Sequence, residues 1–416
     1  MDDTERFKIF KEIVSEFHHR VKIAWTTMDD VRKGGQLWLE NIKERYQDIE
    51  LYSSAQEVVF SEIFYFHNNL ETTPLAKKSV SNDPPFALIM KGGGIKGLAY
   101  IGALEELFRF YKFNWYAGTS AGAISAILLA AGYNLDELNE VMRNKDFSDF
   151  KDANFIKACY NLFSKKGCYE ANTFVIWLNH LLAVKLDSPT AIKLKNLKSR
   201  VTVYASRREK PALIFDSSNP EYASMQAAFA ARCSMSIPFL FTPQKSEGLN
   251  VFDGGLQNNF PVQAMLNDSP ETDFLALYLG PEIFEYKKSS IWSDFESIWT
   301  EAYDTDTIER HKDKVVIIDP RPISTYRFKL SDREKEFLVE NGRLAALKFL
   351  DKRGKLSKHE HNYVERKENL ETERNALVRI KRQRNRKRKL KFSFLFIVIL
   401  LGLNYEKLTE LVNRLF

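Results

Sequence analysis

A serine between two glycines is the residue of this chain best placed to do chemistry. The segment GTSAG stands between an apolar run at 113–117 and an apolar helix pattern at 121–131. A G-x-S-x-G sequence at a strand-to-helix turn holds a serine hydroxyl out over the end of a sheet, and Gly118 and Gly122 leave room for the strained turn. The amino end of the following helix also favours negative charge that develops near it. We therefore predict that Ser120 is a nucleophile.

This nucleophile needs a base, and Asp253 is our candidate. Asp253 follows an apolar run in VFDGGLQNNFPV, with Gly254 and Gly255 directly after it. Taken alone, Asp-Gly-Gly is most often a simple turn, because these residues tolerate turn dihedrals. At the carboxyl end of a buried strand, however, the same carboxylate can approach Ser120 and accept its proton without a histidine. A carboxylate with a pKa of about 4 is a weak base, so we expect partial burial to raise this pKa.

The segment MKGGGIKGLAY holds three consecutive glycines, Gly92, Gly93 and Gly94, and a fourth, Gly97. The spacing satisfies a dinucleotide fingerprint, but the acid required about 20 residues on, at the end of the next strand, is missing. A Walker loop also fails, because Lys96 is followed by glycine. Two interpretations remain: a turn that only permits tight strand-helix packing, or backbone N–H groups that bind an oxyanion. One helix and one strand separate this loop from the serine, which brings both to one sheet edge and favours the oxyanion role.

Alternating strand and helix patterns surround these motifs. They predict an α/β fold with one mostly parallel sheet and helices on both faces. A capping box, Ser331-x-x-Glu334, predicts the start of a long helix. The expected strands are 86–90, 113–117, 201–205, 212–216, 250–253, 274–279 and 314–319.

Two flanking regions complete the predicted organisation. Residues 1–84 combine a helical pattern with the turn-rich linker LETTPLAKKSVSNDPP and contain no visible chemistry. The core domain extends over 85–350. Residues 351–416 form a tail that is rich in lysine, arginine and glutamate and contains a short apolar segment.

Part of this tail, 379–403, has a composition that suits a membrane surface. Residues 379–391 hold nine Lys or Arg and no acid, and 392–403 are almost entirely apolar. Twelve residues make a helix about 18 Å long, too short for a hydrocarbon core of about 30 Å. The segment can bind anionic headgroups and dip into the interface, or it can pack onto the body or onto a second subunit.

Composition excludes several other classes of protein. The net charge is +6, and because 379–391 alone contribute +9, the remainder sums to −3, which argues against a nucleic-acid-binding body. Cys159, Cys168 and Cys233 have neither zinc-ligand spacing nor an even number for pairing, so we expect no metal site and no disulfide framework. The charged first residues lack a secretory pattern, so we expect a cytoplasmic protein, peripheral at the membrane if the tail binds there.

Four motifs in this order resemble the patatin-like phospholipases. They are KGGGIKG, GTSAG, the block ARCSMSIPFLF at 231–241, which is similar to the family's Ser/Pro segment, and DGGLQNNFPV. The resemblance covers roughly 85–350. It departs from many members at Lys91, where they have Asp, and at Lys96, where they have Arg.

The resemblance implies a patatin-type α/β fold and a lipid acyl hydrolase of the phospholipase A type that needs no cofactor. By motif position, Ser120 is the nucleophile, Asp253 is the base, and Gly92, Gly93 and Gly94 form the oxyanion loop. The implied substrates are acyl esters of phospholipids or other lipids. The competing hypothesis is a regulated effector or scaffold whose helical appendages bind a partner or ligand, with hydrolysis secondary or absent.

Overall fold

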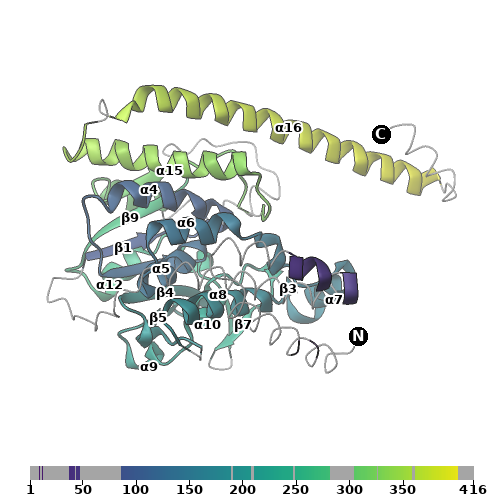
Figure 1. Ribbon diagram of the computed structural model, residues 1–416, viewed down its shortest axis with the longest axis horizontal. Helices are drawn as coiled ribbons and strands as arrows, with labels where there is room; N and C mark the ends of the chain where they lie inside the picture. The colour runs from purple at the N-terminus through teal and green to yellow at the C-terminus, as the bar shows by residue number, and fades with distance from the viewer. Residues whose placement is uncertain are drawn as a thin grey trace.

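The computed structural model (Figure 1) describes residues 9, 12, 37–42, 44–46, 86–188, 191–207, 210–246, 249–281, 304–325, 327–357 and 361–401. Most of the region 1–84, with its expected helices and linker, lies outside these residues. The described pieces 37–42 and 44–46 are helical, as the sequence pattern predicts.

One eight-stranded sheet forms the centre of the molecule, in the order β10-β9-β1-β2-β4-β8-β7, with β5 also paired to β4. A separate two-stranded sheet joins β3 and β6. The strands are β1 (Phe86–Met90), β2 (Trp115–Thr119), β3 (Gly167–Tyr169), β4 (Arg200–Arg207), β5 (Leu213–Asp216), β6 (Phe239–Phe241), β7 (Gln244–Ser246), β8 (Leu249–Asp253), β9 (Asp273–Leu279) and β10 (Val315–Ile318).

The sheet is mixed, with a parallel part and an antiparallel part that meet at β4. β10, β9, β1, β2 and β4 are parallel, whereas β5 and β8 run antiparallel to β4, and β7 runs antiparallel to β8. The prediction of an α/β fold with a mostly parallel sheet is confirmed, and each expected strand is present within two residues of its predicted bounds. The short strands β3, β6 and β7 were not expected, because three-residue strands carry too little periodicity to be recognised.

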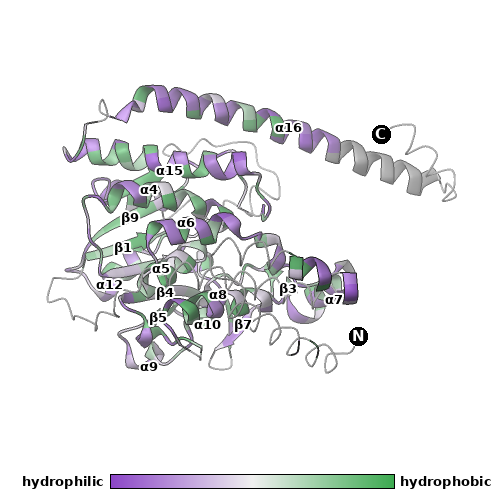
Figure 2. Ribbon diagram, viewed as in Figure 1, coloured by the Kyte–Doolittle hydropathy of each residue, from purple (hydrophilic) through white to green (hydrophobic). Residues whose placement is uncertain are grey.

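Both faces of the sheet are covered by helices. In β1, Leu88 and Met90 belong to the larger apolar core, with side chains of α4, α5 and α15, while Ala87 and Ile89 belong to a second core with side chains of α12. Alternate side chains of a strand point to opposite faces, so β1 is buried on both of them. Figure 2 shows this apolar interior and the more hydrophilic outer helices.

The helices are α4 (Ala99–Leu107), α5 (Ala121–Ala131), α6 (Leu135–Asn144), α7 (Phe155–Lys165), α8 (Asn172–Lys185), α9 (Pro220–Ala223), α10 (Ala227–Ser234), α11 (Gly255–Asn258), α12 (Val262–Asp268), α14 (Asp304–Arg310), α15 (Asp332–Lys352) and α16 (Tyr363–Leu401), with 3-10 turns η1 (Gly94–Leu98), η2 (Phe147–Phe150) and η3 (Leu194–Asn196). Every residue of α5 is buried, which its uniformly apolar sequence explains. The capping box between Ser331 and Glu334 begins α15, as predicted.

Helices α4 and α15 cross at very close range because each contributes a glycine to the contact. A Cβ atom at Gly102 would lie 1.9 Å from the Val339 carbonyl oxygen, and one at Gly342 would lie 1.8 Å from the Ala99 carbonyl oxygen. Only glycine fits at either position. Since α4 begins directly after the glycine loop, this crossing ties that loop to the carboxyl-terminal part of the chain.

The last described element, α16, packs on α15 with its first half. Leu370 and Leu377 are buried against the larger core, and Arg366 pairs with Glu340 of α15 at 2.7 Å. Figure 1 shows α16 lying along α15 and then continuing past its end. Within the described residues, no helix combines the length and apolarity needed to cross a bilayer.

Candidate active site

Ser120 occupies a strained turn between β2 and α5. Its φ of 52° and ψ of −117° are costly for a residue with a side chain, and such strain is characteristic of functional positions. The flanking glycines make the turn possible. A Cβ at Gly118 would lie 2.4 Å from the Gly122 carbonyl oxygen, and one at Gly122 would lie 2.1 Å from the Met90 carbonyl oxygen. The predicted sharp turn is therefore present, with α5 beginning at the next residue.

Helix α5 also directs backbone donors toward this turn. The first N–H groups of an α-helix have no acceptor within the helix, so Ala121 and Gly122 present theirs beside Ser120. The glycine loop was the only predicted source of oxyanion donors, and the N–H of Ala121 was not predicted. Its signal was its position directly after the nucleophile in a G-x-S-x-G turn.

Asp253 and Ser120 meet because β2 and β8 approach each other head-on along one edge of β4. Tyr204 of β4 pairs with Thr119 of β2 on one edge and with β5 on the other. The next residue, Ala205, pairs with Asp253 of β8 and again with β5. A strand residue has one neighbour on each edge, so β2 and β8 share the edge opposite β5. Because β2 is parallel and β8 antiparallel to β4, their carboxyl ends face each other at Ser120 and Asp253. The antiparallel direction of β8 was not predicted from the sequence.

The Asp253 carboxylate is buried and only partly satisfied. Asp253 is 5% exposed, and its Oδ1 accepts the Gly255 N–H at 2.7 Å. Among the described residues, Oδ2 accepts no fully formed hydrogen bond. Burial raises the pKa of Asp253 to about 7, and the Gly255 N–H and the nearby Ser120 hydroxyl oppose that rise without cancelling it. The Asp253 carboxylate therefore lies near the Ser120 hydroxyl, has a pKa of about 7 and keeps one oxygen that is available to accept a proton.

The block 231–241 holds Ser120 and Asp253 in place through hydrogen bonds from their backbones to its carbonyl oxygens and to one hydroxyl. Ser234 accepts the Ser120 N–H at its Oγ (2.8 Å) and the Gly254 N–H at its carbonyl oxygen (3.3 Å). Two residues on, the Ser236 carbonyl oxygen accepts the Asp253 N–H at 2.9 Å. In the sequence, only the family resemblance associated this block with the active site. Its contacts supply the physical reason, because one short segment fixes the backbones of both residues.

A buried arginine holds this block in place. Arg232 is 1% exposed, and its guanidinium donates to the carbonyl oxygens of Glu170 (2.7 Å) and Thr242 (2.9 Å) and to Ser236 Oγ (2.8 Å). Arginine is suited to this role because several N–H donors project from one rigid plane. This role was not predicted, because one of the partners, Glu170, lies 62 residues away in the sequence.

The glycine loop lies against the serine and retains donors. A Cβ at Gly92 would lie 3.4 Å from Ser120 Cβ, and the Gly92 N–H donates to the Asn259 carbonyl oxygen at 2.9 Å. Within the described part of the chain, the N–H groups of Gly93 and Gly94 donate to no protein atom. Gly92 therefore shapes the loop, while Gly93 and Gly94 have N–H groups left for a ligand.

The rest of the loop serves packing. The Lys96 N–H donates to the Gly93 carbonyl oxygen at 3.3 Å, which closes the turn η1. A Cβ at Gly97 would lie 3.1 Å from the Cβ of Ala121. The tight-packing interpretation of the glycines thus applies to Gly97, next to α5.

Lys91 at the start of the loop is completely buried. Its Nζ lies 2.6 Å from Asp304 Oδ2 and 3.9 Å from the centre of the Tyr278 ring. Burial raises the pKa of Asp304, and the Lys91 charge opposes the rise. The pair joins the loop to the start of α14 on the other side of the sheet.

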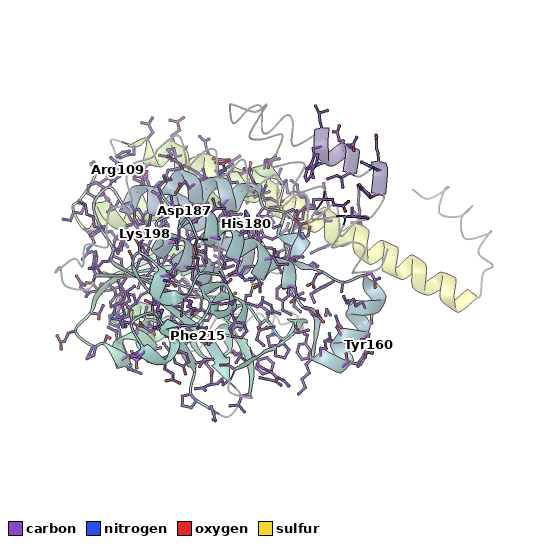
Figure 3. The ribbon with its side chains drawn as sticks, turned by 60° about the horizontal axis from the view of Figure 1, so that its bottom comes forward. Arg109, Tyr160, His180, Asp187, Lys198 and Phe215 are labelled. Carbon is purple, nitrogen blue, oxygen red and sulfur yellow. The ribbon has the colours of Figure 1, made fainter. Side chains whose placement is uncertain are left out.

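Within the part of the chain that the structure describes, no histidine or cysteine hydrogen bonds with Ser120 or Asp253. His180, which is labelled in Figure 3, lies on α8, and His311 follows α14. Neither of them hydrogen bonds with Ser120. Over the described ranges, no group of His, Cys, Asp and Glu is arranged to hold a metal ion.

Comparison with known proteins agrees with the motifs. Residues 88–266 match the family model of the patatin-like phospholipases. The chain has a patatin-like phospholipase domain. Ser120, Asp253 and the glycine loop lie inside this domain, whereas α15 and α16 follow it.

Relatives of the patatin-like domain have varied lengths and sources. The chain is 27% identical over 284 residues to an uncharacterized protein of Acanthamoeba polyphaga mimivirus, covering 64% of this chain and 93% of that protein. It is 25% identical over 224 residues to the intracellular phospholipase A2 of Caenorhabditis elegans, covering 51% of this chain and 19% of that protein. The crystal structure of VipD from Legionella pneumophila superposes with a TM-score of 0.41 at 16% identity, covering 65% of this chain and 67% of that one.

Proposed function

We propose that this protein hydrolyses acyl esters of membrane phospholipids with a Ser120/Asp253 dyad, through an acyl-enzyme. The patatin-like domain and the phospholipase relative support lipid hydrolase activity in general. The finer proposal depends on one observation: Ser120 and Asp253 lie at the facing ends of β2 and β8, where the Ser120 hydroxyl interacts with a buried carboxylate whose Oδ2 accepts no hydrogen bond from the described residues.

In the first step, Ser120 Oγ attacks the acyl carbonyl carbon and its proton passes to Asp253 Oδ2. The carbonyl oxygen becomes negative and accepts hydrogen bonds from the N–H groups of Gly93, Gly94 and Ala121. Loss of one such donor typically costs about 3 kcal/mol of barrier. The ester bond then breaks, and Asp253 returns the proton to the departing alcohol oxygen, which leaves as the lysophospholipid.

In the second step, water replaces the alcohol. Asp253 accepts a proton from the water as its oxygen attacks the Ser120 acyl ester, and the same N–H groups hold the second oxyanion. Collapse releases the fatty acid and returns the proton from Asp253 to Ser120. A base with a pKa of about 7 can accept and release this proton at neutral pH.

Product analysis with three variants tests this proposal. The wild-type protein, incubated with a mixed phospholipid extract, should release fatty acid and lysophospholipid detectable by mass spectrometry. Ser120→Ala and Asp253→Asn should abolish this release, and a fluorophosphonate probe should label wild type but not Ser120→Ala. Near-normal turnover by Asp253→Asn, with loss of turnover in His311→Ala, would show that the dyad is wrong.

We further propose that the basic stretch of α16 meets anionic membrane surfaces. Residues 381–387 are all exposed, and the run 379–391 contains no acidic residue of its own, although Arg384 lies 3.4 Å from Glu334 of α15. Each such cation near an anionic surface contributes about 1 kcal/mol of binding. This contact would bring the enzyme to its substrate.

A further inference from the structure

We infer that α16 positions the oxyanion loop through the segment 319–325, which we call the strap, with Arg374 and Lys381 as the positioning residues. The strap follows the end of β10, accepts hydrogen bonds from α15 and α16, and reaches the glycine loop at Thr325. The inference deepens the proposed function, since it concerns the N–H groups that would hold the oxyanion.

At its far end the strap forms a wall against Gly94. A Cβ at Gly94 would lie 2.6 Å from the Thr325 carbonyl oxygen and 3.1 Å from Thr325 Cγ2. Gly94 has a φ of 56°, a conformation that glycine adopts freely and also leaves freely. With no side chain of its own to restrict rotation, Gly94 depends on its neighbours to keep the orientation of its N–H fixed. Thr325 is such a neighbour.

The near end of the strap is held by side chains of α16. Arg374 Nη1 donates to the carbonyl oxygens of Asp319 (3.1 Å) and Arg321, and Lys381 Nζ donates to the Pro322 carbonyl oxygen at 2.8 Å. Arg374 is largely covered, with 18% of its side chain exposed. A surface loop has few backbone partners of its own, so donors from a neighbouring helix determine its shape.

Helix α15 adds a third donor, which makes the strap a bridge between the two helices and the site. Asn341 donates its amide N–H to the Asp319 carbonyl oxygen. Between the held carbonyls and Thr325, the side chain of Ile323 is 5% exposed and belongs to the larger core. Displacement of the near end therefore shifts a packed segment. The shift reaches Thr325, three to six residues further along the chain, and through Thr325 it reaches Gly94.

Kinetics on a water-soluble short-chain ester test this inference without involving membrane binding. We expect Arg374→Ala to lower kcat roughly 10- to 100-fold and Lys381→Ala to lower it several-fold, with KM changed less than twofold, because misplacement of a catalytic group by about 1 Å can cost 100-fold. Lys381→Arg should restore most of the activity. Lys367→Ala, which removes the same charge from an exposed position on α16, is the matched control and should match wild type.

Two further measurements separate positioning of the loop from loss of fold. The inhibition constant of a trifluoromethyl ketone, which places an oxyanion in the site, should rise in proportion to the loss of kcat/KM across the variants. Hydrogen exchange of the peptide 91–98 should become faster in Arg374→Ala and Lys381→Ala but not in Lys367→Ala. This exchange is measurable even if the wild-type protein hydrolyses no ester, so a failure of the proposed function is seen separately. Unchanged exchange of 91–98 in both variants would overturn the inference, and so would unchanged kcat.

Discussion

Ser234 accepts the backbone N–H of Ser120 at 2.8 Å, and its hydroxyl proton goes to the Tyr204 carbonyl oxygen at 2.6 Å. One fully buried hydroxyl therefore connects the strained serine turn to the strand beside it. The strain at Ser120 persists only if surrounding contacts enforce it, and this hydrogen bond is the one that acts on its own N–H.

We predict that Ser234→Ala lowers both stability and turnover. The change leaves a buried N–H and a buried carbonyl oxygen without this partner, which costs about 1–3 kcal/mol in the free energy of unfolding. Urea denaturation measures that cost, and the rate of fluorophosphonate labelling reports the serine geometry. Ser125→Ala is the matched control, because its hydroxyl bonds only to a carbonyl within the same helix at 3.2 Å. Equal labelling rates for the two variants would contradict the role of Ser234.

The raised pKa of Asp253 predicts the pH dependence of hydrolysis. The base acts only when deprotonated, so kcat/KM should rise with pH through a midpoint of about 7 and level off above it. Below the midpoint, the rate should fall about tenfold for each pH unit. A rate profile with a soluble ester between pH 5 and pH 9 checks this. A midpoint at about 4, the ordinary value for aspartate, would mean that the burial of Asp253 does not govern catalysis.

The same pKa predicts that Asp253 destabilises the fold at alkaline pH. Its folded pKa of about 7 lies above the unfolded value of 3.8, so the folded state holds a proton between these values that the unfolded state releases. Stability from this group is therefore full below pH 3.8 and is lost as pH rises toward 7. Asp253→Asn removes the penalty and should raise the free energy of unfolding at pH 8 by up to about 4 kcal/mol. Urea denaturation at pH 8 and pH 4.5 should show the gain mainly at pH 8.

The buried pair of Lys91 and Asp304 predicts a destabilisation that acid relieves. Lys91→Met leaves the Asp304 carboxylate buried without its cation, at a cost of about 3 kcal/mol at pH 7.5. Burial then raises the pKa of Asp304 further, so the deficit should shrink as pH falls toward 5 and the carboxyl becomes neutral. Denaturation midpoints at the two pH values check this. A deficit that does not change with pH would point to lost packing over the Tyr278 ring instead.

The exposed cations of α16 predict salt-sensitive binding to vesicles. Replacing Arg382, Arg386 and Lys387 together by glutamine should weaken sedimentation with anionic vesicles about 100-fold, from about 1 kcal/mol for each charge. Vesicles of neutral phosphatidylcholine serve as the control, and binding of wild type to anionic vesicles should fall as salt is raised. Unchanged sedimentation of the triple variant with anionic vesicles would remove the case for this surface.

The local features of the site were predictable from the sequence because each is encoded in a few adjacent residues. The turn at Ser120 follows from its two flanking glycines, and the glycine loop follows from an apolar run on one side and a helix pattern on the other. Motif order identified Asp253. The assignment of these residues to catalysis stays a prediction that the experiments above address.

The remaining features depend on contacts between distant parts of the chain, which local patterns do not encode. The antiparallel direction of β8 results from its pairing with β4 through Ala205, some fifty residues earlier. No motif indicated that the Gly92 N–H donates to the Asn259 carbonyl oxygen, or that Arg374 donates to carbonyl oxygens of the strap. A charged run in the sequence indicates a solvated helix, but not which of its members reach back to the body.

The shared edge of β4 has a consequence for how this site can vary. The separation of Ser120 and Asp253 is set by two consecutive residues of β4, Tyr204 and Ala205, together with the block 231–241 that holds both backbones. Insertions and deletions in the connections outside β4 and the block 231–241 would leave the reacting atoms in place as long as β4 keeps its register. The connections around the site are therefore free to diverge in length and sequence, and with them the choice of lipid, while the chemistry stays the same.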